Sequence, residues 1–253
     1  MRKLKHVLES LEPSLYCIHT LGEGSCMVHA MLQACEPEDY TKLDHSGRLD
    51  MAKQFREELS KRVSVDDWEN DAMMYYNFRE KLGRVIDEIR DRTPVIDALK
   101  EETYRNFKQH IRENVSHRGD SDLIQMLEDY VFTQYVNSIK NPKNPMDSTM
   151  LKMVEDVFDV DVYMLTERHG LPYRSLTNKQ GLDRKAVILY WRDSNHYEPV
   201  VRVTGNTYQS KFDSRDPLII LYDLYLSNNP LINRLYPELH QYMPLDYRAK
   251  YPL

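Results

Sequence analysis

The feature that most constrains the fold is an apolar run at residues 26–35, which follows a glycine-rich turn. Gly22 and Gly24 lie in the five residues that end at Cys26, and they predict a tight turn. From Cys26 on, the chain is apolar almost all round and has neither Gly nor Pro before Pro37. This pattern predicts a short buried helix rather than a surface helix. The sequence therefore places a thiol at the start of a core helix.

Cys26 has two interpretations. A free cysteine is among the most buried residue types, and it often serves as a small hydrophobic side chain. At a helix N-terminus, however, unpaired amides and the helix dipole favour a thiolate, and the same amides can stabilise an oxyanion. The chemical interpretation requires a base elsewhere in the chain.

The best candidate for that base is His196, because an imidazole titrates near neutral pH. Among nine histidines, His196 is the one that begins a predicted strand directly after a turn-forming segment, residues 192–195. Side chains alternate along a strand, so Glu198 is predicted to share its face and to hold the imidazole as the third member of a triad. Alone, such a pair is more often two exposed polar residues. Together with the turn and Cys26, it forms a much rarer pattern.

The two ends of the chain differ in character from its middle. Residues 48–140 are helical with few interruptions, which predicts a large helical insertion. Residues 1–12 predict an amphipathic helix, residues 217–226 are ambiguous between helix and strand, and the proline-containing tail predicts irregular structure. A loop at 141–145 is followed by a last clear helix. Three β-branched and aromatic segments then predict strands at 160–165, 186–191 and 197–203. The second and third of these strands are predicted to form a hairpin.

Composition excludes several classes of protein. A net charge of −6 and a pI near 5.9 argue against a general nucleic-acid binder. Three cysteines without CxxC spacing predict neither a disulfide framework nor a zinc site. No segment has the length and apolarity of a signal peptide or a membrane span, so we expect a protein of the cytoplasm that does not bind membranes.

Two segments resemble the motifs of ovarian-tumour-type (OTU) deubiquitinases. Residues 23–26, Glu-Gly-Ser-Cys, are similar to that family's Asp-Gly-x-Cys turn at the start of a buried helix. Residues 195–198, Asn-His-Tyr-Glu, are similar to its strand with His, an aromatic residue and then Asp or Asn. Residues 150–165 also resemble the element before the catalytic hairpin. This chain has Glu23 and Glu198 where the family has shorter side chains, and the extra methylene moves each carboxylate by about an ångström, enough to affect alignment.

The resemblance implies an α+β fold like that of α/β cysteine proteases, with a small central sheet packed by helices. It implies a single catalytic domain over residues 1–253, with 48–140 as an insertion. The implied activity is hydrolysis after the C-terminal glycine of ubiquitin, polyubiquitin or a ubiquitin-like modifier, with no metal or cofactor and in a host cytosol if the protein is an effector.

The resemblance also implies roles for individual residues. Cys26 is the expected nucleophile, His196 the base and Glu198 the orienting carboxylate. Glu23 is expected to shape the turn, in which Gly24 and Ser25 supply oxyanion donors. Two alternatives remain open: a papain-like peptidase of another family, whose third residue comes from a later segment, and a catalytically inactive ubiquitin-binding protein.

Overall fold

The computed structural model describes residues 1–4, 12–65, 120–146, 148–166, 172–174, 184–193, 196–227, 229–235, 237, 240, 245–250 and 252. The chain divides into two compact units. The first is made of Met1–Arg56 and Pro142–Leu253, and the second is Glu57–Asn141. All the predicted site residues belong to the first unit.

The first unit is built on a mixed sheet with the strand order β1-β2-β6-β5-β3-β4. Strands β3 and β5 are parallel, and the other neighbours in this order are antiparallel. Two short strands extend the sheet, β7 beside β6 and β8 beside β5. The bounds are β1 (Arg2–Lys3), β2 (Leu15–Cys17), β3 (Val160–Thr166), β4 (Pro172–Arg174), β5 (Lys185–Arg192), β6 (His196–Thr204), β7 (Thr207–Gln209) and β8 (Lys211–Phe212).

The three predicted strands are confirmed as β3, β5 and β6, and the predicted hairpin is the β5–β6 pair. Arg192 pairs with His196 at the end of this hairpin, so His196 is the first residue of its strand. The middle of β5 is buried without interruption, since Val187, Ile188 and Leu189 are all fully buried. Such a strand reads as a continuous apolar run because both of its faces are covered.

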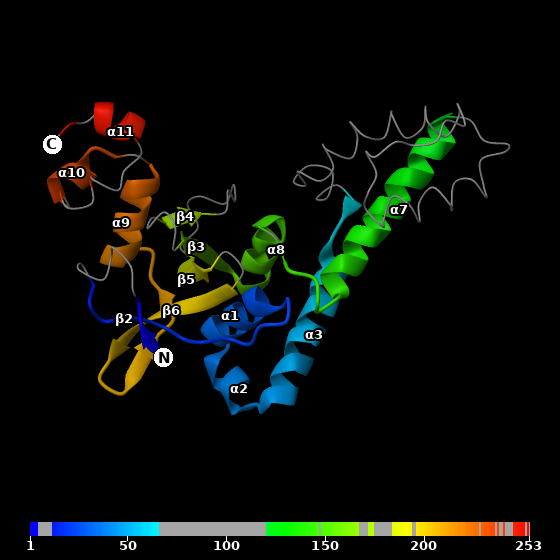
Figure 1. Cartoon of the computed structure of the whole chain (residues 1–253), viewed down its shortest axis with the longest axis horizontal. Coiled ribbons are helices and arrows are strands. Elements are labelled where there is room, and N and C mark those ends of the chain that lie inside the picture. Colours follow the sequence, from blue (N-terminus) through cyan, green and yellow to red (C-terminus); the bar gives the residue numbers. More distant parts are fainter. Residues whose placement is uncertain are drawn as a thin grey trace. The chain divides into compact units, whose positions relative to one another are not determined.

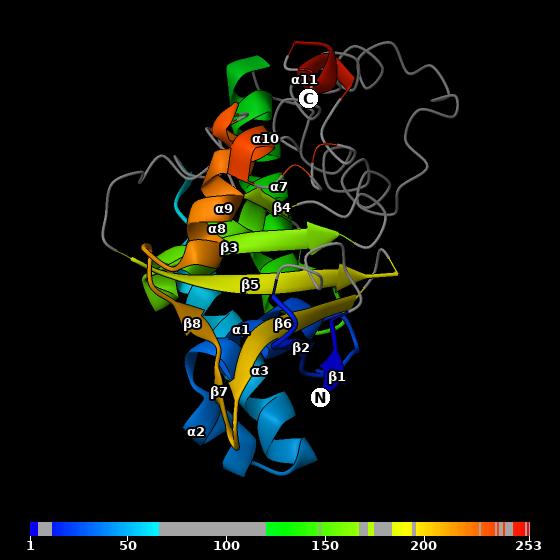
Figure 2. The same ribbon diagram turned by 90° about the vertical axis from the view of Figure 1, so that its left-hand side faces the viewer.

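Helices cover both faces of the sheet (Figures 1 and 2). Helix α9 (Pro217–Leu226) lies on one face, where Leu218, Ile219 and Tyr222 share a core cluster with Ile188 and Val200 of the strands. Helices α1 (Cys26–Cys35) and α8 (Ser148–Phe158) lie on the other face, and α1 packs against β6 and β5. This arrangement confirms the predicted α+β fold with a central sheet packed by helices.

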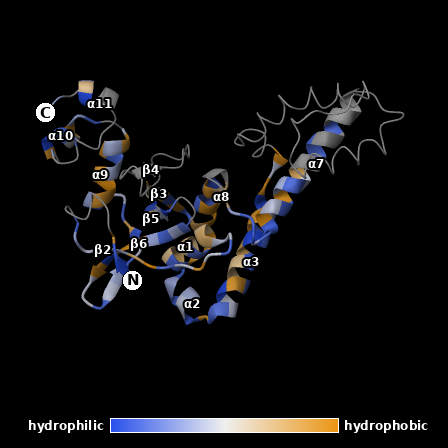
Figure 3. Ribbon diagram, in the orientation of Figure 1, coloured by the Kyte–Doolittle hydropathy of each residue, from blue (hydrophilic) through white to orange (hydrophobic). Residues whose placement is uncertain are grey.

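Helix α1 is buried over its whole length, as the apolar run predicts. In Figure 3 it lies mainly on the hydrophobic side of the scale, whereas α3 (His45–Arg62) mixes both kinds of residue. Between them, α2 (Pro37–Lys42) starts with a proline at a position where no backbone donor is needed. The hydroxyl of its Tyr40 lies 2.8 Å from Nδ1 of His29, which gives a polar partner to an imidazole inside the core.

Asp216 settles the ambiguous run at 217–226 as a helix. Its carboxylate accepts a hydrogen bond from the backbone amide of Leu218 at 3.0 Å, and Pro217 follows at the first helical position. Both are helix-start signals. Arg202 of β6 holds the same carboxylate through contacts of 2.6 and 2.9 Å. A cap and a cross-sheet ion pair together fix where α9 begins.

Two sequence predictions in this unit are wrong. Arg2 and Lys3 form strand β1 rather than part of a helix, because they add to the edge of β2; the rest of the predicted helix, residues 5–11, lies outside the described residues. The C-terminal tail is not wholly irregular, since it contains the short helices α10 (Leu231–Leu235) and α11 (Leu245–Lys250). Its prolines flank these helices instead of interrupting them.

The second unit contains the end of α3 and the helix α7 (Asp120–Lys140), in agreement with the helical character predicted for residues 48–140. Residues 66–119 of this predicted insertion lie outside the described residues. Among the helices that the structure describes, none has both the length and the apolar character needed to cross a membrane.

Candidate active site

The turn before Cys26 has two consecutive residues in the left-handed region, Glu23 with φ 63° and Gly24 with φ 83°. Gly24 is required for a second reason. A Cβ at this position would lie 2.5 Å from the carbonyl oxygen of Lys143, a backbone atom that cannot turn aside as a side chain can. The glycine of the motif therefore allows both the backbone conformation and the close approach of the 142–144 loop.

Arg56 stabilises this turn through hydrogen bonds from a buried position. It is fully buried, and its guanidinium donates to Ser25 Oγ at 3.3 Å and to the carbonyl oxygen of Asn144 at 2.9 Å. Ser25 Oγ in turn donates to the carbonyl oxygen of Pro142 at 2.9 Å. Burial lowers the pKa of Arg56 to about 10, which still leaves it cationic at neutral pH. The turn is thus held by a buried positive charge that the sequence patterns do not reveal.

Cys26 is the first residue of α1, as predicted, and it is buried. Helix geometry leaves the first amides of α1 without intrahelical partners, and Ser25 does not cap them with its side chain. The other two cysteines are poor nucleophiles, because burial raises the pKa of Cys17 and of Cys35 to about 12 in each case. Of the three cysteines, Cys26 is the one at the N-terminus of a described helix, a position that favours a thiolate.

The segment that leads into Cys26 runs beside β6 toward His196. Cys17 pairs with Val200, the amide of Ile18 donates to the carbonyl oxygen of Pro199 at 3.0 Å, and Thr20 reaches the end of the strand. Thr20 lies six residues before Cys26. The β2 extension therefore guides the chain to the His196 end of β6 immediately before the glycine turn and α1.

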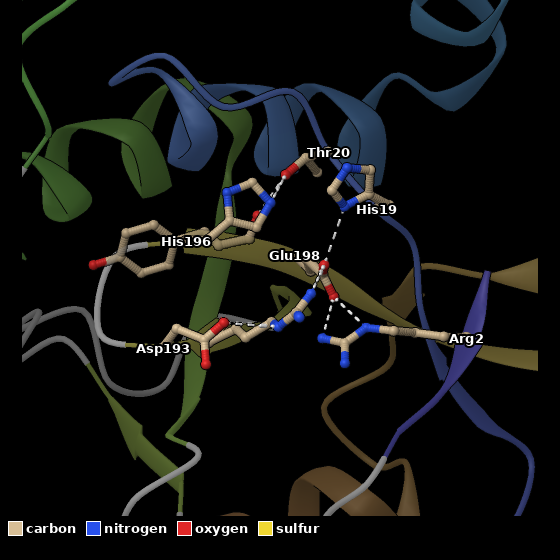
Figure 4. Close-up of polar contacts among 8 residues, drawn as sticks. Arg2, His19, Thr20, Asp193, His196 and Glu198 are labelled. Carbon is tan, nitrogen blue, oxygen red and sulfur yellow. Dashed lines mark hydrogen bonds and ion pairs between the residues drawn. The ribbon is translucent and has the colours of Figure 1, made fainter.

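Thr20 determines the tautomer of His196. Its hydroxyl donates to the carbonyl oxygen of Tyr197 at 2.6 Å, and the same oxygen lies 3.2 Å from Nε2 of His196 (Figure 4). A threonine hydroxyl has one proton, so toward His196 it can only accept. Nε2 must then carry the imidazole proton, which leaves Nδ1 as the basic nitrogen.

His196 is half-buried, and this burial lowers its pKa below the ordinary value of 6.5. The charge of Glu198 raises the pKa of His196, whereas His19, Arg192 and Arg2 lower it. The net effect keeps the ring neutral, and so able to accept a proton, at neutral pH and somewhat below.

Glu198 is completely buried at the centre of a charged cluster. Arg2 donates to its Oε2 from Nε at 3.1 Å and from Nη2 at 2.7 Å. Nδ1 of His19 lies 3.3 Å from Oε1, and Nη1 of Arg192 lies 3.7 Å from the same oxygen. A Glu198 oxygen and a His196 nitrogen lie within 4.8 Å, but no hydrogen bond joins these two side chains among the described residues. Glu198 acts on His196 by its charge, and Thr20 by a hydrogen bond.

Sequence reasoning did not select Arg2, His19, Thr20 or Arg56. Arg2 is nearly two hundred residues from Glu198 along the chain, and strand β1 brings it there. His19 lies in the segment beside β6, with its ring centroid 5.5 Å from that of His196. No local pattern marks these residues, although an arginine within the predicted N-terminal helix could have been considered as a partner for a carboxylate.

Glu23 lies on the surface of the turn. Glu23 contributes to the turn through its backbone, whose φ lies in the left-handed region, rather than through a described contact of its carboxylate. His29, the histidine of α1, is unsuited to act as a base: its Nδ1 lies 2.8 Å from the hydroxyl of Tyr40, and burial lowers its pKa to about 4.

Solved structures that are similar to this chain include the following three. An ovarian tumour (OTU) domain in complex with ubiquitin is 14% identical over 81% of this chain and 78% of its own, with a TM-score of 0.43. The OTUD1 OTU domain is 12% identical over 74% and 86%, with a TM-score of 0.36. An OTU deubiquitinase from Wolbachia pipientis wMel is 12% identical over 76% and 93%, with a TM-score of 0.38. No protein-family model and no curated protein matches the sequence.

Proposed function

We propose that the protein is a cysteine-dependent deubiquitinase of the OTU type, which hydrolyses the bond after the C-terminal glycine of ubiquitin, polyubiquitin or a ubiquitin-like modifier. Two sequence motifs support this proposal, the Glu-Gly-Ser-Cys turn and the His-Tyr-Glu strand. The observation that carries it is the contact between Thr20 and His196, because it brings the approach to Cys26 to the strand end that holds the base.

The proposed reaction is acyl transfer through a thioester. Nδ1 of His196 takes the proton from the Cys26 thiol, and the thiolate attacks the carbonyl carbon of the terminal glycine. Backbone amides of the turn and the first residue of α1, from Gly24 to Cys26, donate to the oxyanion of the tetrahedral intermediate. Nδ1 then returns the proton to the departing amine. Water, deprotonated by the same nitrogen, hydrolyses the thioester and restores the thiol.

Two residues are proposed to support His196. Thr20 holds Nε2, and Glu198 supplies a negative charge that stabilises the imidazolium formed during the reaction. Arg56 keeps the oxyanion turn in place from a buried position. All three cysteines are free thiols, which suits a reducing compartment such as the cytosol.

The papain-like alternative requires an Asn or Asp from a later segment against His196. The described side chain at Nε2 is instead the hydroxyl of Thr20, which comes from the segment before the nucleophile. This favours the OTU-type assignment over that alternative. An inactive ubiquitin-binding protein would have the same fold as an active enzyme and would differ only in its lack of catalysis. An experiment is therefore needed to distinguish the two.

The test is covalent capture by ubiquitin that carries a C-terminal propargylamide. We expect the wild-type protein to form a stable adduct and Cys26→Ala to form none. Cys17→Ser and Cys35→Ser are the matched controls, because both thiols are buried and remain protonated, and both variants should still be captured. Binding of ubiquitin without capture would identify an inactive binding protein. Capture that depends on Cys17 would show that the wrong nucleophile is assigned.

A further inference from the structure

His19, His196 and Glu198 form a cluster with the composition of a metal site. One nitrogen of each imidazole and one carboxylate oxygen of Glu198 all lie within 4.8 Å of one another. Imidazole nitrogens and a carboxylate oxygen are ligands that Zn²⁺ accepts, with a fourth position open to water. Tetrahedral Zn²⁺ places its ligand atoms about 3.4 Å apart, given metal–ligand bonds near 2.1 Å. The cluster must therefore contract by an ångström or so to hold the ion.

The side chains can make this contraction because the cluster has one mobile member and one fixed member. The side chain of His19 is 75% exposed, so it can rotate and also gives an ion access from solvent. Glu198 is fully buried and is held by two hydrogen bonds from Arg2 to Oε2. A ligating carboxylate that is hydrogen-bonded through its other oxygen is the usual outer-shell arrangement of metal sites.

Arg2 and Arg192 carry positive charges next to Glu198 that would repel a bound cation. Arg2 remains on Oε2, on the side of the carboxylate away from the imidazole of His19. Arg192 lies 3.7 Å from Oε1, but its Nε also pairs with Asp193 at 3.0 Å. An ion at Oε1 replaces the direct contacts of that oxygen with His19 and Arg192, and an ion on Nε2 of His196 also replaces the hydrogen bond to Thr20. Arg192 can stay on Asp193, and Arg2 stays on Oε2.

From this geometry we infer that His19, His196 and Glu198 bind a divalent transition-metal ion of the Zn²⁺ type, and that the bound ion inhibits the enzyme. An imidazole that binds a metal through one nitrogen carries its proton on the other. His196 in that state cannot accept the proton of Cys26. Inhibition rests on the proposed function, whereas binding of the ion does not.

Binding is tested by calorimetric titration of the purified protein with ZnCl₂. We expect one ion per chain for the wild type, and at least about a tenfold loss of affinity for His19→Asn, since even outer-shell changes cost that much. His45→Asn is the matched control, because His45 is an exposed histidine outside the cluster, and it should bind like the wild type. MgCl₂, whose ion prefers oxygen ligands, should give no heat at the same concentrations.

The Cys26→Ala variant distinguishes the proposed site from one in which Zn²⁺ is bound by the Cys26 thiol and an imidazole. We expect this variant to bind Zn²⁺ like the wild type, since Cys26 is not one of the three ligands. Loss of binding in Cys26→Ala, or unchanged binding in His19→Asn, would overturn the assignment. These titrations need no substrate, so they stand whether or not the protein acts on ubiquitin.

Inhibition is tested on the adduct-forming reaction with the ubiquitin probe. Zn²⁺ should slow capture by the wild type, and EDTA should restore it. The rate of His19→Asn, compared with its own rate in EDTA, should change little when Zn²⁺ is added. Equal inhibition of both proteins would overturn the inhibitory role. Absence of capture in every sample, with Zn²⁺ binding intact, would overturn the deubiquitinase proposal and leave the metal site standing.

Discussion

At the scale of single residues, the tautomer of His196 depends on its hydrogen bond with the hydroxyl of Thr20. The Thr20 hydroxyl gives its one proton to the Tyr197 carbonyl and so must accept from Nε2 of His196. The hydrogen bond therefore does two things: it orients the ring, and it selects the tautomer whose Nδ1 is free. In the serine-protease template the wrong tautomer costs about 10⁴-fold in rate.

Replacing this hydroxyl tests the orienting role. We expect Thr20→Val, which keeps the shape of the side chain, to lower kcat/KM on a ubiquitin–fluorophore amide by about ten- to a hundredfold, a discount on that template. Thr20→Ser keeps the hydroxyl and should stay within about threefold of the wild type. A ¹⁵N spectrum of the His196 ring should show protonated Nε2 in the wild type and a mixture in Thr20→Val. Equal rates and spectra for the two variants would remove the tautomer argument.

Glu198 is expected to matter through its charge. Because this charge raises the pKa of His196, Glu198→Gln should lower that pKa further and move the acid limb of the kcat/KM profile to lower pH. The wild-type limb itself should lie below pH 6.5. The rate on the plateau should fall by roughly ten- to a thousandfold, because the imidazolium is less stabilised.

Glu23→Gln is the matched control for this prediction, since Glu23 is exposed on the turn. It should cost less activity than Glu198→Gln and leave the acid limb in place. Thermal melts are needed for both variants, because the arginines around Glu198 lose their partner in Glu198→Gln. A larger loss at Glu23 would assign the functional acid to the turn.

At the scale of elements, the turn into α1 is the most constrained piece of backbone in the site. Gly24 combines a φ of 83° with a Cβ position 2.5 Å from the Lys143 carbonyl oxygen. Gly22, two residues earlier, has open space around its Cβ position. The two glycines therefore differ in the demand that the fold places on them, although the sequence shows them as similar.

This difference predicts opposite results for two alanine substitutions. Gly24→Ala should lower the free energy of unfolding by more than about 1–2 kcal/mol, the cost of a left-handed residue with a side chain, because a backbone clash adds to it. Gly22→Ala should change that free energy by less than about 1 kcal/mol in either direction. Urea denaturation of both variants measures the difference. A Gly24→Ala protein as stable as Gly22→Ala would contradict the close approach of the 142–144 loop.

At the scale of the whole molecule, the first unit is formed by the two ends of the chain and the second by its middle. The points where the chain leaves and re-enters the first unit are tied together, since Arg56 binds the carbonyl oxygen of Asn144 at 2.9 Å. The site residues and the sheet are all contributed by the first unit. The prediction of one catalytic domain with a helical insertion therefore has a direct test.

The test is to replace residues 57–141 with a short Gly/Ser linker. Because Arg56 and the 142–144 loop are close, a flexible linker of a few residues can join them without strain. We expect a protein that unfolds cooperatively in a thermal melt and that the ubiquitin probe captures through Cys26. If the full-length protein is soluble and the shortened protein shows no melting transition, the middle segment is needed for folding.

The sequence by itself determined the elements whose signals are local. The apolar run at 26–35 indicated α1, the β-branched and aromatic segments indicated β3, β5 and β6, and the turn at 192–195 placed His196 at a strand end. The ambiguous run at 217–226 needed its context, because the cap at Asp216 is completed by Arg202 from β6.

Only the tertiary structure decided what surrounds His196 and Glu198. Arg2, His19 and Thr20 come from the N-terminal segment, and each is more than 170 residues from its partner on β6. Periodicity and propensity report on neighbours within a few turns of the chain, whereas these contacts depend on which strand lies beside β6. Strand β2 takes that place, and β1 adds to the other edge of β2. Both pair through backbone hydrogen bonds that nearly any residue can make, so no side-chain pattern predicts them.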